Sequence, residues 1–269
     1  MKKFFQILMF LSTFTFVSCE EDIILDFDKT VPRLVIEANI FAEESVYNKI
    51  HLSTTTDYYS NVYPSIDDAQ VSIKDLSNNV DYSFLSIGNG DFSNLSFRPQ
   101  NDIMYELTVV YKDEIYKAVS TPLEAPEIVD IQQTENNNLG GEWYEFRFHY
   151  QDNPDEENYY LSQMIAPTSI SFGTWNDQFD NGNLTNDLFL FLKEDVQSGD
   201  TLYYAINSIN KEYYIYLSKI LSISGSATNP FASPMGTIKG NIVNQTNKDN
   251  YALGYFHLAK RNHYTYIVK

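Results

Sequence analysis

The sequence predicts an all-β protein built from two sandwich-like domains, because its composition favours strands and its apolar residues recur with a period of two. Of its 269 residues, 43% are hydrophobic and 15% aromatic, more than a disordered chain contains. Tyr and Phe, which favour strands, number 21 and 18, whereas Gly and Pro number only 11 and 9. We therefore expect a well-packed, mainly β fold.

Residues 33–122 are predicted to form an immunoglobulin-like β-sandwich. Apolar residues alternate with polar ones from Leu34 to Ile40, which is typical of a half-buried strand. The tripeptide Lys112-Asp113-Glu114 between two strand-like runs predicts a tight hairpin. Six or seven short strands over about 90 residues are typical of such a sandwich. The further strand-like runs are Ile50–Thr54, Ala69–Ile73, Phe92, Leu95–Phe97, Met104–Tyr111 and Ile115–Val119.

Residues 123–269 are predicted to form a second β-rich, sandwich-like domain. The segment Thr121–Pro126 contains two prolines close together, which a central strand excludes, so we place the boundary there. Gly173–Asp187 is expected to be a long loop, either functional or mobile. The strand-like runs of this domain are Tyr144–Tyr150, Tyr159–Met164, Leu188–Leu192, Thr237–Val243, Tyr251–Leu258 and Tyr264–Val268.

One amphipathic helix is predicted within the second domain, at about 208–224. Apolar residues between Ile209 and Leu221 fall on a single face at helical spacing. Ser208 is the expected N-cap and Gly225 the expected end. We expect the apolar stripe to pack on a sheet rather than bind a partner helix.

Residues 1–18 have the features of an export signal that ends at the chain's single cysteine. Two lysines precede an apolar stretch from Phe4 to Val17, which is shorter than the roughly 20 residues that span a membrane. Phe16–Cys19 resembles a bacterial lipobox, with Phe16 where leucine is usual. Cys19 is therefore predicted to be lipidated, since a free thiol in an oxidising compartment would need another explanation. The alternative is an ordinary secretory signal with a free thiol.

Residues 19–32 are predicted to be an acidic tether between a lipid anchor and the first domain. Glu20, Glu21 and Asp22 resemble the signal that sends lipoproteins of Bacteroidetes-type bacteria to the outer face of the outer membrane. The alternative is that these acids only make the tether polar. Removing residues 1–18 deletes two of 18 basic residues and none of 36 acidic ones, so the net charge becomes −20. This charge disfavours nucleic acid as a partner.

No catalytic motif is present in the sequence. The four histidines, His51, His149, His257 and His263, lack a close metal-binding spacing, although folding could bring them together. Gly-x-Ser-x-Gly and phosphate-loop patterns are absent. Paired carboxylates carry little information in so acidic a chain. We expect a protein that is not an enzyme.

Two acidic loops are candidate calcium sites, and one of them also contains an aromatic group. Asp177, Asp180, Asn181 and Asn183 supply oxygen ligands at short spacing, as do Asp152, Asp155, Glu156 and Glu157. A solvated acidic loop is the simpler interpretation, and no other cofactor is expected. Phe172, Trp175 and Phe179 form a possible ligand loop for a sugar or peptide, with ordinary packing as the alternative.

Seven elements of the sequence together match one known pattern. They are Cys19-Glu20-Glu21, the strand Arg33–Ala38, the helix, Asn229-Pro230-Phe231, Pro234, Gly240-Asn241-Ile242 and Gly254-Tyr255-Phe256. With them the sequence resembles the Bacteroidetes outer-membrane lipoprotein family called domain of unknown function 4249. The resemblance spans essentially the whole mature chain, and its most specific part is C-terminal. It implies a two-part lipoprotein that is often encoded beside TonB-dependent outer-membrane receptors, with no accepted activity and no catalytic residues.

Anchor, architecture and resemblance together lead to an expected function. We expect a non-catalytic lipoprotein on the cell surface that assists a TonB-dependent transporter in nutrient uptake, as an accessory or ligand-binding partner. The first alternative is a structural or assembly subunit of an outer-membrane protein complex. The second is a surface hydrolase, which would place a histidine within reach of a carboxylate and a hydroxyl in one pocket.

Overall fold

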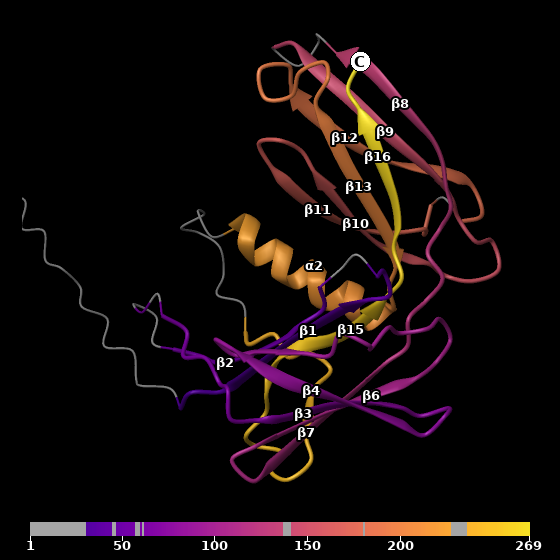
Figure 1. Cartoon of the computed structure of the whole chain (residues 1–269). Coiled ribbons are helices and arrows are strands. Elements are labelled where there is room, and N and C mark those ends of the chain that lie inside the picture. The colour runs from indigo at the N-terminus through magenta and orange to yellow at the C-terminus, as the bar shows by residue number, and fades with distance from the viewer. Residues whose placement is uncertain are drawn as a thin grey trace, which may run out of the picture. The chain divides into compact units, whose positions relative to one another are not determined.

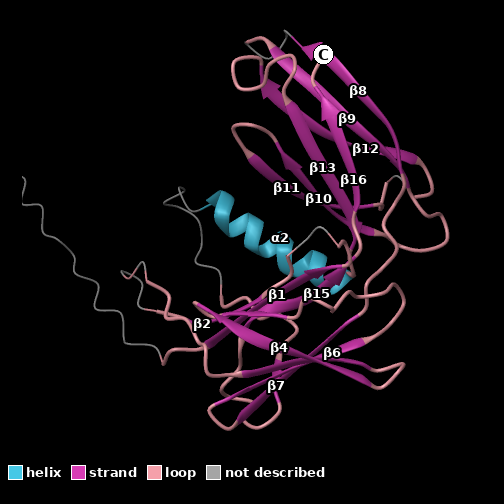
Figure 2. Cartoon of the chain, in the orientation of Figure 1, coloured by secondary structure: helices cyan, strands magenta, loops and turns pink. Residues whose placement is uncertain are grey.

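The part of the chain that the structure describes folds into two β-sandwiches and one helix, as the sequence predicts (Figures 1 and 2). The computed structural model describes residues 31–44, 47–56, 60, 62–136, 141–179, 181–226 and 236–269. Within these residues the strands form sheets of nine, four and three strands.

The first sandwich is made of the nine-stranded sheet, which folds over on itself at β4. The N-terminal half of β4 pairs with β3, and its C-terminal half pairs with β5. One layer therefore holds β1, β2, β5 and β15, and the other holds β3, β6, β7 and β14. The strands are β1 (Leu34–Phe41), β2 (Ile50–Thr54), β3 (Gln70–Asp75), β4 (Val80–Gly88), β5 (Asp91–Ser93), β6 (Tyr105–Tyr111), β7 (Glu114–Ser120), β14 (Val243–Asn244) and β15 (Leu253–Ala259).

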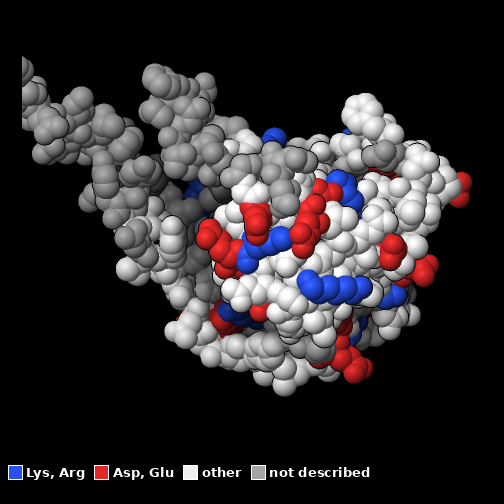
Figure 3. Space-filling model, turned by 90° about the horizontal axis from the view of Figure 1, so that it is seen from above, with Lys and Arg blue, Asp and Glu red and all other residues white. Residues whose placement is uncertain are grey.

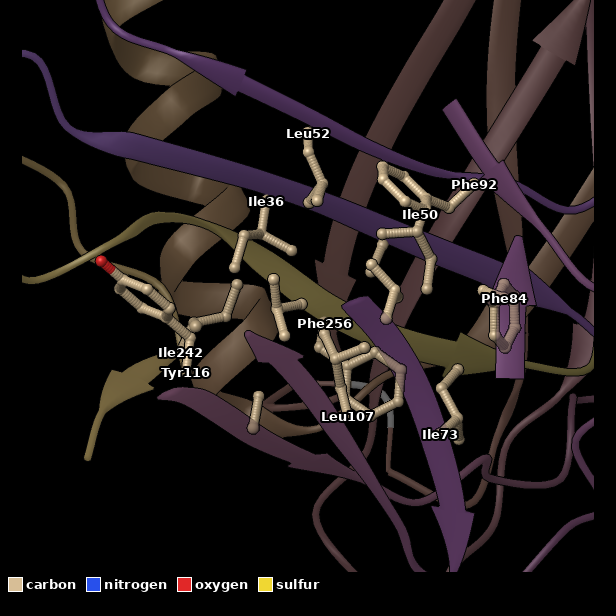
Figure 4. Close-up of a cluster of buried hydrophobic side chains, with 14 of the residues drawn as sticks. Ile36, Ile50, Leu52, Ile73, Phe84, Phe92, Leu107, Tyr116, Ile242 and Phe256 are labelled. Atoms are coloured by element: carbon tan, nitrogen blue, oxygen red, sulfur yellow. The ribbon is translucent and has the colours of Figure 1, made fainter. Parts of the chain in front are cut away.

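The core of the first sandwich is filled by alternate residues of the two layers. Ile36 of β1 and Phe256 of β15 face Ile73 and Leu107 of β3 and β6, and all four side chains are fully buried (Figure 4). Each buried aliphatic or aromatic side chain of this size contributes about 1.5–3 kcal/mol to folding. The alternating apolar residues that predicted these strands are therefore the residues that fill the core.

Two strands from the C-terminal part of the chain belong to this first sheet, which the expected domain 123–269 did not anticipate. β15 pairs in parallel with β1 from Val35 with Leu253 to Phe41 with Ala259 (Figure 1). Pro32–Lys269 form one compact unit. The expected boundary at 122/123 would assign the paired strands β1 and β15 to different domains. The physical reason is that β1 needs a neighbour on each side to satisfy its backbone groups.

The family block around Gly240 and Gly254 makes this junction possible. A Cβ atom on Gly240 would lie 1.7 Å from the carbonyl oxygen of Gly254, and one on Gly254 would lie 2.0 Å from that of Ile36. Asn241 accepts a hydrogen bond from the amide of Phe256 and donates one to its carbonyl, both at 2.9 Å. These residues thus act in backbone packing. Of the expected strand Thr237–Val243, only Val243 lies in a strand, which is β14.

The second sandwich packs a four-stranded sheet against a three-stranded sheet. The four-stranded sheet has the order β11-β10-β13-β16, and the three-stranded sheet has the order β12-β9-β8. Phe146 and Phe148 of β9 and Tyr204 of β13 lie in the core between them. The strands are β8 (Ile128–Asn136), β9 (Trp143–Gln151), β10 (Tyr159–Ile165), β11 (Ile170–Asn176), β12 (Leu184–Leu192), β13 (Thr201–Ser208) and β16 (Asn262–Ile267).

The helix α2 (Lys211–Ser226) covers one end of the outer face of the four-stranded sheet. Its N-cap is Asn210, whose side chain accepts a hydrogen bond from the amide of Tyr213 at 2.8 Å, and not the expected Ser208. Ser208 still lies in β13 and donates its hydroxyl to the carbonyl of Glu124. The predicted packing of the stripe is confirmed, because Tyr213 is buried against Tyr255.

Two other local expectations differ from the structure. Leu95–Phe97 is a turn rather than a strand, because the side chain of Asn94 accepts hydrogen bonds from the amides of Ser96 and Phe97. The expected loop Gly173–Asp187 is mostly strand, since β11 extends to Asn176 and β12 begins at Leu184. Pairing with β10 and β9 supplies the partners that the local sequence does not reveal.

Candidate functional site

The region where β11 passes into β12 contains most of the candidate residues that the sequence indicates. A small cavity of about 120 Å³ lies here, lined by Asp152, Asp177 and Asp187 together with Trp175. The three aspartates are 2%, 5% and 2% exposed. Buried carboxylates must be compensated, so their partners decide what the cavity can do.

Asp187 is held by a chain of hydrogen bonds that crosses the core of the second sandwich. Tyr204 donates its hydroxyl to Oδ2 of Asp187 at 2.7 Å, and the Ser162 side chain also bonds to this carboxyl. Trp175 donates from Nε1 to Oγ of Ser162 at 3.1 Å. Burial raises the pKa of Asp187 to about 6, although the bonds from Ser162 and Tyr204 act in the opposite direction. This carboxyl therefore titrates near neutral pH.

Asp152 and Asp177 fasten the chain on either side of the β11–β12 connection. Asp152 accepts hydrogen bonds from the hydroxyl of Tyr160 and from the amide of Gly182, the latter at 2.6 Å. Asp177 accepts the amide of Asn158 at 2.8 Å. Both carboxylates are therefore engaged in holding backbone, which is the usual role of a buried Asp.

The expected calcium ligands are only partly placed by the structure. Asp177 is bound to Asn158 as above, Asn181 and Asn183 are exposed, and Asp180 lies outside the described residues. Among the described residues, no group of three or more His, Cys, Asp and Glu is arranged to hold a metal ion. In the other acidic loop, Glu157 pairs with Lys211. Calcium binding at 177–183 stays a prediction.

The size of the cavity limits its chemistry. A volume of about 120 Å³ holds a few water molecules, whereas pockets for organic ligands measure about 300–1,000 Å³. The carboxylates that line it are taken up by hydroxyl and amide donors. We conclude that this cavity is a polar part of the core.

The expected aromatic ligand loop is not one surface. Phe172 and Trp175 both lie on β11, but an odd separation along a strand sends them to opposite faces. Trp175 turns inward to Ser162, and Phe172 lies on the outer face, 55% exposed. Phe179 lies in the connection and is 87% exposed. All three side chains are therefore partly exposed, Trp175 at 45%, but Trp175 lies on the opposite face of β11 from Phe172.

Phe172 belongs to a larger apolar surface, which we call the outer sheet surface. Ile170, Ile165 and Tyr203 are direct cross-strand neighbours on β11, β10 and β13. On the same face, Phe172 of β11 lies two residues to one side of this row, level with Ala205, and Ile267 of β16 lies two residues to the other side, level with Thr201. The exposed fractions of the five residues run from 37% to 63%. The outer sheet surface comprises Ile165, Ile170, Phe172, Tyr203 and Ile267.

The outer sheet surface is not evident from the sequence, for an identifiable reason. Phe172 belongs to an expected ligand loop, and no strand is expected at 201–208, where Tyr203 lies in β13. A signal was present in β13, where Tyr203 and Tyr204 are adjacent aromatic residues that must face opposite sides of a strand. Tyr204 is buried, so Tyr203 is left outside.

The histidines do not form a hydrolase site within the described residues. His51 contacts Asp91 at 2.7 Å and His263 contacts Glu43 at 2.9 Å, and Lys49 and Arg261 bind the same two carboxylates. None of the described histidines is recorded in hydrogen-bond contact with both a carboxylate and a hydroxyl. His257 stacks on Tyr213, and burial lowers its pKa to about 3.

The predicted anchor residues Cys19, Glu20, Glu21 and Asp22 lie outside the described residues. No helix in the described part of the chain has the length and apolar character needed to cross a membrane. On the face seen in Figure 3, acidic and basic side chains are interspersed rather than separated by sign. Lys260 and Glu124 form one of the ion pairs at the surface of the described residues.

These features define an all-β protein of two sandwiches, with a polar core cavity and an exposed apolar sheet surface. The chain belongs to the family described as "Domain of unknown function (DUF4249)", whose model matches residues 20–265. No curated protein matches the chain. The predicted family membership is thereby confirmed.

Two solved structures of fibronectin domains from chicken show a distant similarity. The FN1–FN3 domains of CNTN1 match with 9% identity and a TM-score of 0.27, over 68% of this chain and 62% of that chain. A two-domain fibronectin type III segment of tenascin matches with 11% identity and a TM-score of 0.20, over 66% and 91%. Similarity at this level does not bear on function.

Proposed function

We propose that this chain is a lipid-anchored protein of the outer bacterial surface that serves as a non-catalytic accessory partner of a TonB-dependent transporter. The family membership supports the proposal, as do the lipobox ending at Cys19 and the acids Glu20, Glu21 and Asp22 that follow it. A single acyl chain binds membranes only marginally, whereas a bacterial lipoprotein by resemblance carries about three, enough for stable anchoring.

The observation that carries the proposal is the outer sheet surface. A strongly acidic chain with a net charge of −18 has ample polar side chains to cover a sheet face, yet Ile170, Phe172 and Tyr203 stand together in solvent. Contiguous exposed apolar residues mark interaction sites in soluble proteins. Aromatic residues such as Phe172 and Tyr203 are enriched at the centres of such sites. The surface therefore suits a protein partner.

The length of the tether limits which partners can reach this surface. The 14 residues from 19 to 32 span at most about 50 Å when fully extended. A partner must therefore lie close to the membrane, as the extracellular loops of an outer-membrane transporter do. A structural or assembly subunit of another outer-membrane complex would meet the same condition, and it remains the second candidate.

Affinity purification from detergent-solubilised membranes tests the proposal. The lipoprotein should co-purify with a TonB-dependent transporter, and replacing both Phe172 and Tyr203 by Ser should lower recovery about 30-fold, the effect of losing roughly 2 kcal/mol at an interface centre. Leu85→Ser is the matched control, because Leu85 is 71% exposed on β4 of the first sandwich. Recovery of an assembly or secretion machine instead would favour the second candidate.

The anchor is tested separately. Cys19→Ala should either release the protein from the membrane or leave it uncleaved, because the acylated residue is removed. Unchanged membrane association together with normal processing would contradict the anchor and, with it, the location of the proposed function.

A further inference from the structure

Two cations are held on one aromatic ring next to the start of the folded chain. The guanidinium carbon of Arg33 and the Nζ atom of Lys239 each lie 3.7 Å from the centre of the Tyr251 ring. The two positive charges are therefore no further apart than twice that distance, 7.4 Å. Cation–π contacts fix both side chains in place, although their charges repel each other.

Neither cation is neutralised by a carboxylate of the described residues. Arg33 donates from Nη1 to the main-chain carbonyl of Asp249, and ion pairs to its guanidinium or to Lys239 are not found among those residues. Elsewhere in this acidic protein, lysines commonly have such partners, as Lys49 does in Asp91 and Lys117 in Glu106. A fixed pair of unneutralised cations is an arrangement that attracts an anion.

A groove that Lys239 lines gives an anion room to bind, and Arg33 reaches its neighbourhood through the Tyr251 ring that it shares with Lys239. It has a volume of about 470 Å³, within the range of ligand pockets, and it lies between α2 and the segment 236–241. Lys239 and Lys219 both line it, together with the aromatic side chains of Tyr216 and Tyr255. Glu212 is the acidic residue of the lining, and no ion pair joins it to either lysine.

The position of the groove in the sequence indicates which anion is nearby. Arg33 directly follows the tether 19–32, whose predicted lipid anchor keeps it within about 50 Å of the membrane. Arginine and lysine are the residues that bind phosphate, the former through its planar fork of N–H groups. We propose that Lys219 and Lys239 in the groove, with Arg33 next to Lys239 at the Tyr251 ring, form a phosphate-binding site, and that its ligand is the phosphate of an anionic lipid headgroup, whose charge no choline cation offsets. The proposal rests on the anchor of the proposed function but not on its transporter.

Vesicle flotation of residues 20–269, the chain without its lipid, tests this inference. The segment contains every described element of the fold, so it is expected to fold. It should float with vesicles of phosphatidylcholine and phosphatidylglycerol, despite its negative net charge, and not with phosphatidylcholine alone. Arg33→Gln with Lys239→Gln should lower partitioning about 30-fold, since each cation near an anionic surface contributes about fivefold. Lys112→Gln is the control, because Lys112 lies over Tyr111 at a distant hairpin.

Three results would overturn the inference. Wild-type protein that floats no better with the anionic vesicles shows that no headgroup is bound. A double variant that melts and floats like wild type shows that these cations are not the site, and Lys219→Gln repeats the test if the double variant does not fold. Inorganic phosphate that raises the Tm without any flotation identifies free phosphate as the ligand. If the double variant no longer floats but still co-purifies with the transporter, lipid binding and transporter binding use different surfaces, the groove and the outer sheet surface.

Discussion

The buried carboxyl of Asp187 should make the stability of the second sandwich depend on pH in a direction opposite to that of an ordinary aspartate. Its pKa is about 6 in the folded protein and 3.8 in an exposed aspartate. A raised folded-state pKa means that the stability from this group is fully present below pH 3.8 and is lost as the pH rises through 6. The difference of about 2 pKa units corresponds to a loss of about 3 kcal/mol.

The change Asp187→Asn isolates this effect. Asparagine keeps the size of the side chain and an oxygen that accepts the hydroxyl of Tyr204, but it cannot ionise. Relative to wild type, the variant should therefore gain stability as the pH rises, by roughly half of the 3 kcal/mol between pH 5 and pH 8. Measurements below pH 5 are avoided because the pI is about 4.4, where proteins precipitate.

Urea unfolding followed by tryptophan fluorescence measures this difference, since Trp175 belongs to the same hydrogen-bond chain. The exposed Asp155→Asn serves as the control and should show the pH dependence of wild type. If the stability difference between Asp187→Asn and wild type stays constant from pH 5 to pH 8, the raised pKa and the burial argument behind it are refuted.

Four further substitutions test the fold, and one addition tests the calcium prediction. Gly254→Ala should prevent folding, because its methyl would lie 2.0 Å from a carbonyl oxygen of β1. Gly88→Ala is the control, because Gly88 has a similar φ but open space around it. This control should lower the free energy of unfolding by only about 1–2 kcal/mol, measured by thermal melts. Asn241→Ala should lower the free energy of unfolding by about 2 kcal/mol through the loss of its paired bonds to β15, and an unchanged Tm would contradict that role. Asp113→Gly should stabilise the β6–β7 hairpin by about 1 kcal/mol, since this residue has a φ of 62°, and a lower Tm would contradict the steric argument. Millimolar calcium should raise the Tm if the connection 177–183 binds it, and the absence of a shift would exclude that prediction.

The local features of the first sandwich could be predicted because their causes are local. The strand at Leu34 follows from alternation, and the hairpin follows from the short polar connection at Lys112-Asp113 between two strand-like runs. The φ angles of these residues, 49° and 62°, are those of a tight turn. The prediction of a strand at Leu95–Phe97 was wrong. It relied on the apolar residues of this segment, whereas the side chain of Asn94 forms a turn there. A side chain that bonds its own backbone competes with a sheet at this position.

The candidate site was harder to predict, because it depends on which face each residue takes. Asp187 lies on the same face of β12 as Phe189 and Phe191. Once this segment is known to be a strand, its alternation predicts that Asp187 is buried. The same rule separates Phe172 from Trp175. Hydrogen bonds between strands that are distant in sequence, such as Tyr204 to Asp187, leave no local pattern.

The parallel pairing of β1 with β15 has a consequence for how the chain can fold. Residues 33–122 alone would lack β14 and β15, so β1 would become an exposed edge with its backbone groups unpaired along one side. The core would also lose Phe256 and Leu258, which contribute about 1.5–3 kcal/mol each, against a total stability of about 5–15 kcal/mol for a domain.

We therefore expect the fragment 33–122 to remain unfolded, in contrast to the independent domain that the sequence indicates. Circular dichroism and amide NMR should show no cooperative unfolding for the fragment alone. A peptide of residues 240–260, which contains β14 and β15, should restore structure, whereas a peptide of residues 200–220 from the second sandwich and α2 should not. Cooperative unfolding of the fragment alone would show that β15 is dispensable. If the expectation is met, β1, the first strand that the structure describes, is completed only after β15 has been synthesised.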